Sequence, residues 1–148
     1  MSSLQDRVWP LLSVLTELTR EWSEARRHLL LYPPKPLTFA KEYRTVRFGS
    51  ARQIGHTTAG LQLANERPDP TLFLTHNAGL ARMAQELGKE VDLKEHVQIL
   101  PMKSSKWRTG TYGLVIVDCA TFLSHGDEDK VYALARDAEN CPLFVFLQ

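Results

Sequence analysis

Four short runs of apolar residues, separated by segments with helical periodicity, constrain the fold of this 148-residue chain more than any other feature. The runs lie at Thr71–Thr75, Val97–Leu100, Gly113–Asp118 and Leu143–Leu147. A continuous apolar run is typical of a strand that is buried on both faces, and such strands alternate with helices in parallel sheets. The pattern therefore predicts an α/β protein in which helices cover both faces of a mainly parallel sheet.

A fifth strand and several helices complete this prediction. The segment Tyr43–Phe48 is expected to be a strand, although two arginines make it unusual for one buried on both faces. Apolar residues recur at three- and four-residue steps over residues 3–30, which predicts an N-terminal amphipathic helix. Further helices are expected at Thr57–Asn65, Ala78–Leu87 and Asp129–Glu139. The predicted fold is thus a three-layer α/β/α domain with about five strands.

The prolines at 33, 34 and 36 divide the chain into two parts. Because proline lacks an amide hydrogen and clashes with the preceding helical turn, the first helix must end before them. We expect residues 1–36 to form the helix and a stiff connector, and residues 37–148 to form one compact domain.

Charge and cysteine usage exclude several classes of protein. A net charge of +1 argues against a broadly basic nucleic-acid coat protein, although residues 1–60 are net basic and residues 61–148 net acidic. Two cysteines do not make a disulfide framework, and early charges interrupt any signal peptide, so we expect a cytoplasmic protein without a membrane span. The histidines and cysteines have no metal-ligand spacing, so neither zinc nor haem is expected; they lie at His28, His56, His76, His96, His125, Cys119 and Cys141.

The segment Ser50–Thr58, between a predicted strand and a predicted helix, has the spacing of a phosphate-binding loop. Ser50 is followed by four residues and then by Gly55-His56-Thr57. In such a loop, backbone amides and the helix N-terminus surround phosphates, and a hydroxyl in the place of Thr57 binds magnesium. The usual lysine is replaced by His56, and a histidine is shorter and mostly neutral near pH 7. We therefore expect weaker nucleotide binding and a larger loss of catalysis.

The strand Leu114–Val117 ends in Asp118, as a magnesium-holding carboxylate requires. Its place at the carboxyl end of a strand is where open α/β sheets bind ligands. The alternative is a buried strand whose aspartate only caps the next turn. Cys119 follows, and a neutral thiol is a poor general base.

The order of these elements resembles the first ATPase domain of helicases and of viral large-terminase packaging motors. The segment Ala51–Thr58 (Ala-Arg-Gln-Ile-Gly-His-Thr-Thr) is similar to the terminase loop Ser-Arg-Gln-x-Gly-Lys-Thr-Thr. Thr71–Leu87 looks like the helicase strand-turn-helix that contacts a nucleic-acid backbone, and Tyr112–Phe122 looks like the magnesium-binding strand. The resemblance covers about residues 40–148 and departs from the family at His56 and Cys119.

The resemblance implies a set of site residues. Thr57 and Asp118 would hold magnesium, Arg52 would act on the phosphates in partial replacement of the lysine, and Gln148 would lie near the sensor position. Arg52, Asp118 and Gln148 are therefore the candidates for any catalysis. The candidate cofactor is weakly bound Mg-ATP, and the phosphate contacts are expected from Ala51, Arg52, Gln53, Ile54, Gly55, His56, Thr57 and Thr58.

Two functions remain open at this point. The first is a reduced P-loop NTPase-like protein, with at most weak ATPase activity, in a nucleic-acid-associated process such as DNA packaging or replication. The second is a non-catalytic scaffold or adaptor that binds a protein partner or DNA and no longer uses nucleotide. A homo-oligomer is compatible with either. Candidate nucleic-acid contacts are Lys103, Lys106, Trp107 and Arg108, where an aromatic among cations could stack on a base or be an ordinary loop aromatic.

Overall fold

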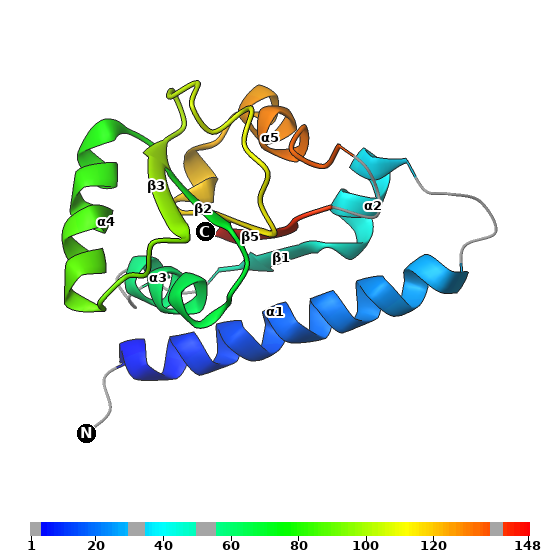
Figure 1. Cartoon of the computed structure of the whole chain (residues 1–148), viewed down its shortest axis with the longest axis horizontal. Coiled ribbons are helices and arrows are strands. Elements are labelled where there is room, and N and C mark those ends of the chain that lie inside the picture. Colours follow the sequence, from blue (N-terminus) through cyan, green and yellow to red (C-terminus); the bar gives the residue numbers. More distant parts are fainter. Residues whose placement is uncertain (1–3, 30–34, 50–55, 137–140) are drawn as a thin grey trace.

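The architecture is three-layered, with helices on both faces of one sheet (Figure 1). A computed structural model of the chain describes residues 4–29, 35–49, 56–136 and 141–148. The strands are β1 (Thr45–Phe48), β2 (Thr71–Thr75), β3 (Val97–Pro101), β4 (Leu114–Val117) and β5 (Leu143–Leu147). The helices are α1 (Leu4–Leu29), α2 (Pro36–Tyr43), α3 (His56–Glu66), α4 (Ala78–Glu90), the 3-10 helix η1 (Ala120–Phe122) and α5 (His125–Tyr132).

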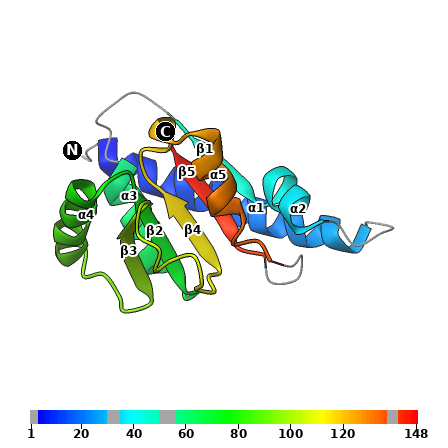
Figure 2. The same cartoon turned by 90° about the horizontal axis from the view of Figure 1, so that it is seen from above.

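All five strands are parallel, in the order β1-β5-β4-β2-β3, and Figure 2 shows them side by side. Every residue of β2, β4 and β5 is buried, whereas the edge strands β1 and β3 are only partly buried. This difference explains the sequence pattern, because only a strand covered on both faces requires a continuous apolar run. The predicted three-layer fold with a five-stranded sheet is therefore confirmed.

Two hydrophobic cores lie on opposite faces of the sheet. Because side chains alternate along a strand, Leu114 and Ile116 of β4 enter one core and Val115 and Val117 the other. The first core is closed by α1, α3 and α4, and the second by α2, α5 and the segment that contains Trp107. The inner side of α1 contributes to the first core, while the predicted domain boundary after residue 36 stays a prediction.

The structure corrects three predicted elements. Helix α2 was not expected, because Pro36 was interpreted only as a helix breaker, whereas proline is well tolerated in a first helical turn. Helix α5 begins at His125, four residues before the predicted start, because Ser124 caps it by accepting a hydrogen bond from the Asp127 amide. It ends at Tyr132, before the predicted Glu139. Helix α4 continues past Leu87 to Glu90.

The two arginines near β1 find partners at an edge of the sheet. Arg44 precedes the strand and is buried, with its guanidinium donating to the Ser23 hydroxyl at 2.8 Å and to the Pro142 carbonyl at 3.3 Å. Arg47 lies over the ring of Phe146, 4.6 Å from its centre, and pairs with Glu128. Because β1 is an edge strand, it can carry these charges, which a central strand could not.

Candidate functional site

The candidate site lies at the carboxyl end of the sheet. The connections that leave β2 and β4 go to opposite faces, since α4 packs in the first core and η1 and α5 in the second. In open α/β sheets, a ligand crevice forms where neighbouring strands diverge in this way. Asp118 directly follows β4 at this place, and its amide donates to the Leu74 carbonyl of β2.

The central contact of the site joins two residues that are far apart in sequence. The Thr57 hydroxyl, in the first turn of α3, donates to Asp118 Oδ2 at 2.6 Å. The other oxygen, Oδ1, accepts from the Cys119 amide at 3.0 Å. Asp118 is buried, with 6% of its surface exposed. The residues expected to hold magnesium are thus adjacent in the folded chain.

A glycine in α3 allows this contact to form although β1 is at the edge of the sheet. A Cβ atom on Gly60 would lie 2.8 Å from Leu147 Cδ1 and 3.0 Å from Phe73 Cε2, so the helix sits directly on β5 and β2. Thr57 is about one turn earlier and is therefore carried across to β4. This role of Gly60 was not predicted from the sequence, where its signal is a glycine inside a predicted helix.

The electrostatics of the site follow from burial. Burial raises the pKa of the Asp118 carboxyl, while the Thr57 hydroxyl, the Cys119 amide and the charge of His56 act in the opposite direction. Burial and the neighbouring Asp118 charge raise the pKa of the Cys119 thiol. A neutral thiol at this position cannot serve as a general base near pH 7.

Cys119 and His56 shape the ends of the two elements. Cys119 adopts a left-handed conformation with φ of 56°, which is uncommon for a residue with a side chain, and this turn aims its amide at Asp118. His56 is the first residue of α3, and its ring meets the Phe48 ring edge-on at 5.6 Å between centres. The imidazole therefore packs against the end of β1, and its charge acts on the Asp118 carboxyl.

The remaining predicted phosphate contacts are only partly described. Ala51, Arg52, Gln53, Ile54 and Gly55 lie outside the described residues, so the anion cradle and the role of Arg52 stay predictions. Thr58 is half-buried in the first turn of α3.

Gln148 lies beside Gly49, the last described residue before the predicted phosphate-binding loop. Its backbone amide donates to the Phe48 carbonyl at 2.9 Å, and a Cβ atom on Gly49 would lie 3.5 Å from Gln148 Cβ. Gln148 therefore lies beside Phe48 and Gly49 at the carboxyl end of the sheet.

The site offers donors that suit magnesium. A hydroxyl and a carboxylate are hard oxygen ligands, and Mg²⁺ commonly uses one or two carboxylates and completes its shell with water and phosphate oxygens. Thr57 and Asp118 would hold such an ion. Among the described residues, no three His, Cys, Asp or Glu side chains lie close enough together to bind a metal on their own.

Trp107 is not available to stack on a base. It is fully buried, and its indole Nε1 donates to the Met102 carbonyl at 3.2 Å. Of the two interpretations of Trp107, a base-stacking aromatic is therefore wrong, because the ring fills the second core. Lys103, Lys106 and Arg108 are exposed around it, so the basic part of this candidate surface is accessible.

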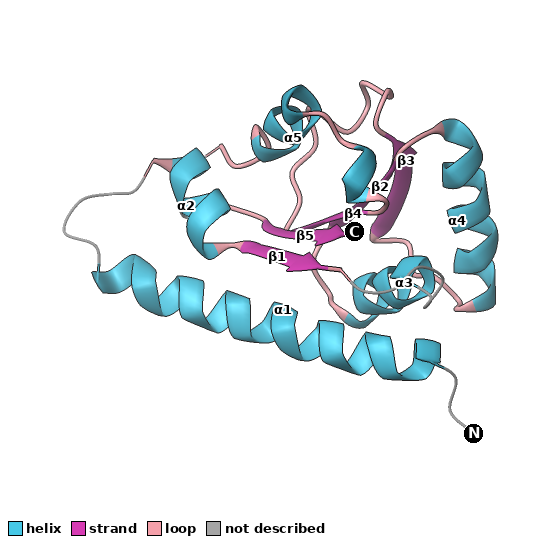
Figure 3. Ribbon diagram, turned by 180° about the vertical axis from the view of Figure 1, so that it is seen from behind, coloured by secondary structure: helices cyan, strands magenta, loops and turns pink. Residues whose placement is uncertain are grey.

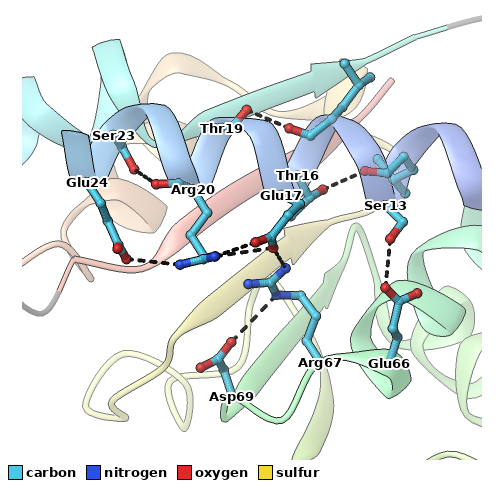
Figure 4. A network of polar contacts seen from close by, with 12 residues as sticks. Ser13, Thr16, Glu17, Thr19, Arg20, Ser23, Glu24, Glu66, Arg67 and Asp69 are labelled. Carbon is cyan, nitrogen blue, oxygen red and sulfur yellow. Dashed lines mark hydrogen bonds and ion pairs between the residues drawn. The ribbon is translucent and has the colours of Figure 1, made fainter. Parts of the chain in front are cut away.

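A polar network occupies the opposite end of the sheet and attaches α1 to the domain (Figure 4). Glu17 of α1 accepts hydrogen bonds from Arg20 and, at 3.0 Å, from Arg67, which also lies 3.6 Å from Asp69. These two guanidinium groups lower the pKa of Glu17 to about 2. Beside the network lies an open cavity of about 660 Å³ that these residues help to line.

Comparison with protein-family models and with curated protein sequences gave no match. Among the described residues, no helix combines the length and apolar character that crossing a membrane requires.

Proposed function

We propose that this chain is a reduced P-loop NTPase-like protein that binds a nucleotide or phosphate ligand with magnesium and has at most weak ATPase activity. The single observation that supports the proposal most is the 2.6 Å hydrogen bond between Thr57 and Asp118. The terminase-like and helicase-like order of its segments supports a role in a nucleic-acid-associated process such as DNA packaging or replication.

The residues of this chain would divide the binding task between them. Thr57 and Asp118 would hold the magnesium ion, which neutralises phosphate charge when it is bound. The start of α3 presents amides and a partial positive charge to an anion. A bound cation would also offset the free-energy cost of burying the ionised Asp118 carboxyl, since burial disfavours that form.

The same residues limit catalysis. His56 stands where a lysine would bridge phosphates, and the imidazole is too short to reach as far as a lysine amine. Cys119 stands where an acid would activate water, and its raised pKa keeps the thiol protonated. We therefore expect binding in the high-micromolar to millimolar range and little turnover.

Isothermal titration with Mg-ATP tests this proposal. Thr57→Val removes only the hydroxyl and is expected to weaken Mg-ATP binding about tenfold, on the order of 1.4 kcal/mol. Thr109→Val, at an exposed position in the β3–β4 segment, is the matched control and should leave binding unchanged. His56→Lys should tighten binding. Absence of binding at millimolar nucleotide in both the wild type and His56→Lys would reject the proposal.

The second candidate is a scaffold that no longer uses nucleotide and binds DNA or a protein partner. The exposure of Lys103, Lys106 and Arg108 on one connecting segment favours it. If three cations contact phosphates, the logarithm of DNA affinity should fall with the logarithm of salt concentration with a slope of about −2.7. A steep slope that these three lysine and arginine residues control would support DNA binding, and the lack of any DNA affinity would leave a protein partner as the scaffold's ligand.

A further inference from the structure

Helix α1 has apolar side chains on both of its faces, and only one face is covered by the domain. Its inner face buries Val8 and Leu12 against the first core. On its outer side, large apolar residues remain exposed: Leu11 by 52%, Val14 by 56%, Leu18 by 47% and Trp22 by 62%. Figures 1 and 3 show α1 on the outside of the molecule, with no other helix or strand on its side away from the sheet.

These four residues form one continuous stripe. They follow each other at steps of three, four and four residues, so at about 100° per residue they fall within an arc of roughly 80°. The guanidinium of Arg26 lies over the Trp22 ring, 5.4 Å from its centre, and closes one end of the stripe. Contiguous exposed apolar surface of this kind marks interaction sites in proteins.

The outer stripe is not a by-product of core packing, because the inner face of α1 is polar in the second half of the helix. Thr16 and Ser23 are fully buried there, and Glu17 and Arg20 form the network with Arg67. The large apolar side chains described in this half, Leu18 and Trp22, are exposed by 47% and 62%. The second half of α1 is therefore attached through polar contacts, and its large apolar side chains stay exposed.

We propose that the outer stripe of α1 pairs in parallel with the same stripe of a second copy of this chain. The argument for this occupant is charge complementarity. Glu21 and Arg26 are exposed, lie on opposite flanks of the stripe and are five residues apart. This is the separation at which flanking charges of opposite sign pair across a parallel two-helix seam. The two-fold symmetry of such a dimer forms the Glu21–Arg26 pair twice.

The direction and strength of the pairing follow from the same residues. An antiparallel seam would bring each flank against its own copy and so would not join Glu21 to Arg26. Four half-exposed side chains supply less than the roughly 800 Å² per partner of a standard stable interface. The dimer is therefore expected to be weak, with a dissociation constant in the micromolar range.

Sedimentation equilibrium of the whole chain tests the stripe. The wild type should show a concentration-dependent monomer–dimer equilibrium between about 1 and 500 µM. Leu18→Lys places two like charges in the seam and should weaken the dimer at least tenfold. Met83→Lys changes a side chain on α4 that is 60% exposed and should leave the equilibrium unchanged. A wild type that stays monomeric over this range, or equal effects of the two variants, overturns the proposal.

Charge reversal and cross-linking test the direction. Glu21→Arg and Arg26→Glu should each weaken the dimer, and the double variant should restore it, which binding to an unrelated partner would not produce. Under oxidation, Leu11→Cys and Trp22→Cys should each form a disulfide dimer alone, with the wild type, which has Cys119 and Cys141, as the control. Cross-linking only when the two variants are mixed indicates an antiparallel pair and contradicts the proposal.

Discussion

At each end of the sheet lies a carboxyl group with a shifted pKa, and the two shifts have opposite directions. At the amino end, Glu17 is held by Arg20 and Arg67, and its pKa falls to about 2. At the carboxyl end, Asp118 is held by a hydroxyl and one amide, and burial raises its pKa. The first carboxylate is stabilised as an anion by its own protein, whereas the second is destabilised as an anion.

This difference shows which end can gain from a ligand. A cation that approached Glu17 would have to compete with two guanidinium groups, while one that approached Asp118 would supply the charge that its surroundings lack. Groups that are strained or poorly compensated in the free protein gather at functional sites. The network around Glu17 is accordingly interpreted as attachment of α1, and the surroundings of Asp118 as a binding site.

Helix α3 connects the two ends, and filling the space at Gly60 should have the largest effect. Gly60→Val would push the helix away from Leu147 and Phe73, and we expect the free energy of unfolding to fall by about 3 kcal/mol. Urea denaturation followed by circular dichroism measures this change. Because Thr57 moves with the helix, binding of Mg-ATP should also weaken.

The same substitution at an open position provides the control. A Cβ atom on Gly126 would meet only the Ser124 hydroxyl at 3.8 Å, so Gly126→Val should change the stability by no more than about 0.5 kcal/mol. Equal effects at the two glycines would show that α3 does not require close contact with the sheet.

Removal of Arg67 should break the amino-end network while sparing the carboxyl end. The side chain is 12% exposed and holds both Glu17 and Asp69. Arg67→Ala should lower the free energy of unfolding by about 1–2 kcal/mol, since Glu17 is half-exposed and water screens part of the interaction. Lys89→Ala, which removes an exposed ion pair with Glu86, should cost less than about 0.5 kcal/mol. If Arg67→Ala reduced the free energy of Mg-ATP binding as much as the free energy of unfolding, the two ends of the sheet would not act independently.

The smallest effects are the pH dependences, which should have opposite signs. Glu17 contributes its full stability above its ordinary pKa of 4.5, and this contribution is lost as the pH falls towards 2. Glu17→Gln should therefore be less stable than wild type above pH 4.5, by about 0.5 kcal/mol, and the difference should disappear towards pH 2. Asp118 carries no penalty below its ordinary pKa of 3.8 and an increasing one as the pH rises towards its raised pKa, so Asp118→Asn should be more stable than wild type at pH 7. Urea denaturation at several pH values measures both differences, and equal signs would contradict the comparison.

The sheet could be predicted from the sequence because its central strands are continuous apolar runs. Continuous apolar runs such as Leu114–Val117 satisfy only a strand covered on both faces. Local signals that serve two purposes were less informative. Pro36 both follows the end of α1 and begins α2, and the acids at 127–129 lie inside the first turns of α5, which Ser124 starts.

The candidate site was predicted in part. The spacing of the loop pattern and the acid after β4 indicated Thr57 and Asp118, but their contact spans 61 residues and depends on strand order, which periodicity does not specify. Trp107 among its basic neighbours did not reveal that its ring is buried. The sequence of α1 does not show that Val8 and Leu12 are covered while Leu11 is exposed, and only the packing against α3 shows this difference.

The most direct test of the central claim is line broadening of backbone amide signals by Mn²⁺, a substitute for magnesium at oxygen ligands, in the presence of ATP. The backbone amide signals of Thr57, Asp118 and Cys119 are expected to broaden first, while those of Glu17, Arg20 and Arg67 stay sharp. Asp118→Asn should abolish the selective broadening. Broadening that begins around Glu17, or that spares Thr57 and Asp118 at millimolar nucleotide, would contradict the central claim.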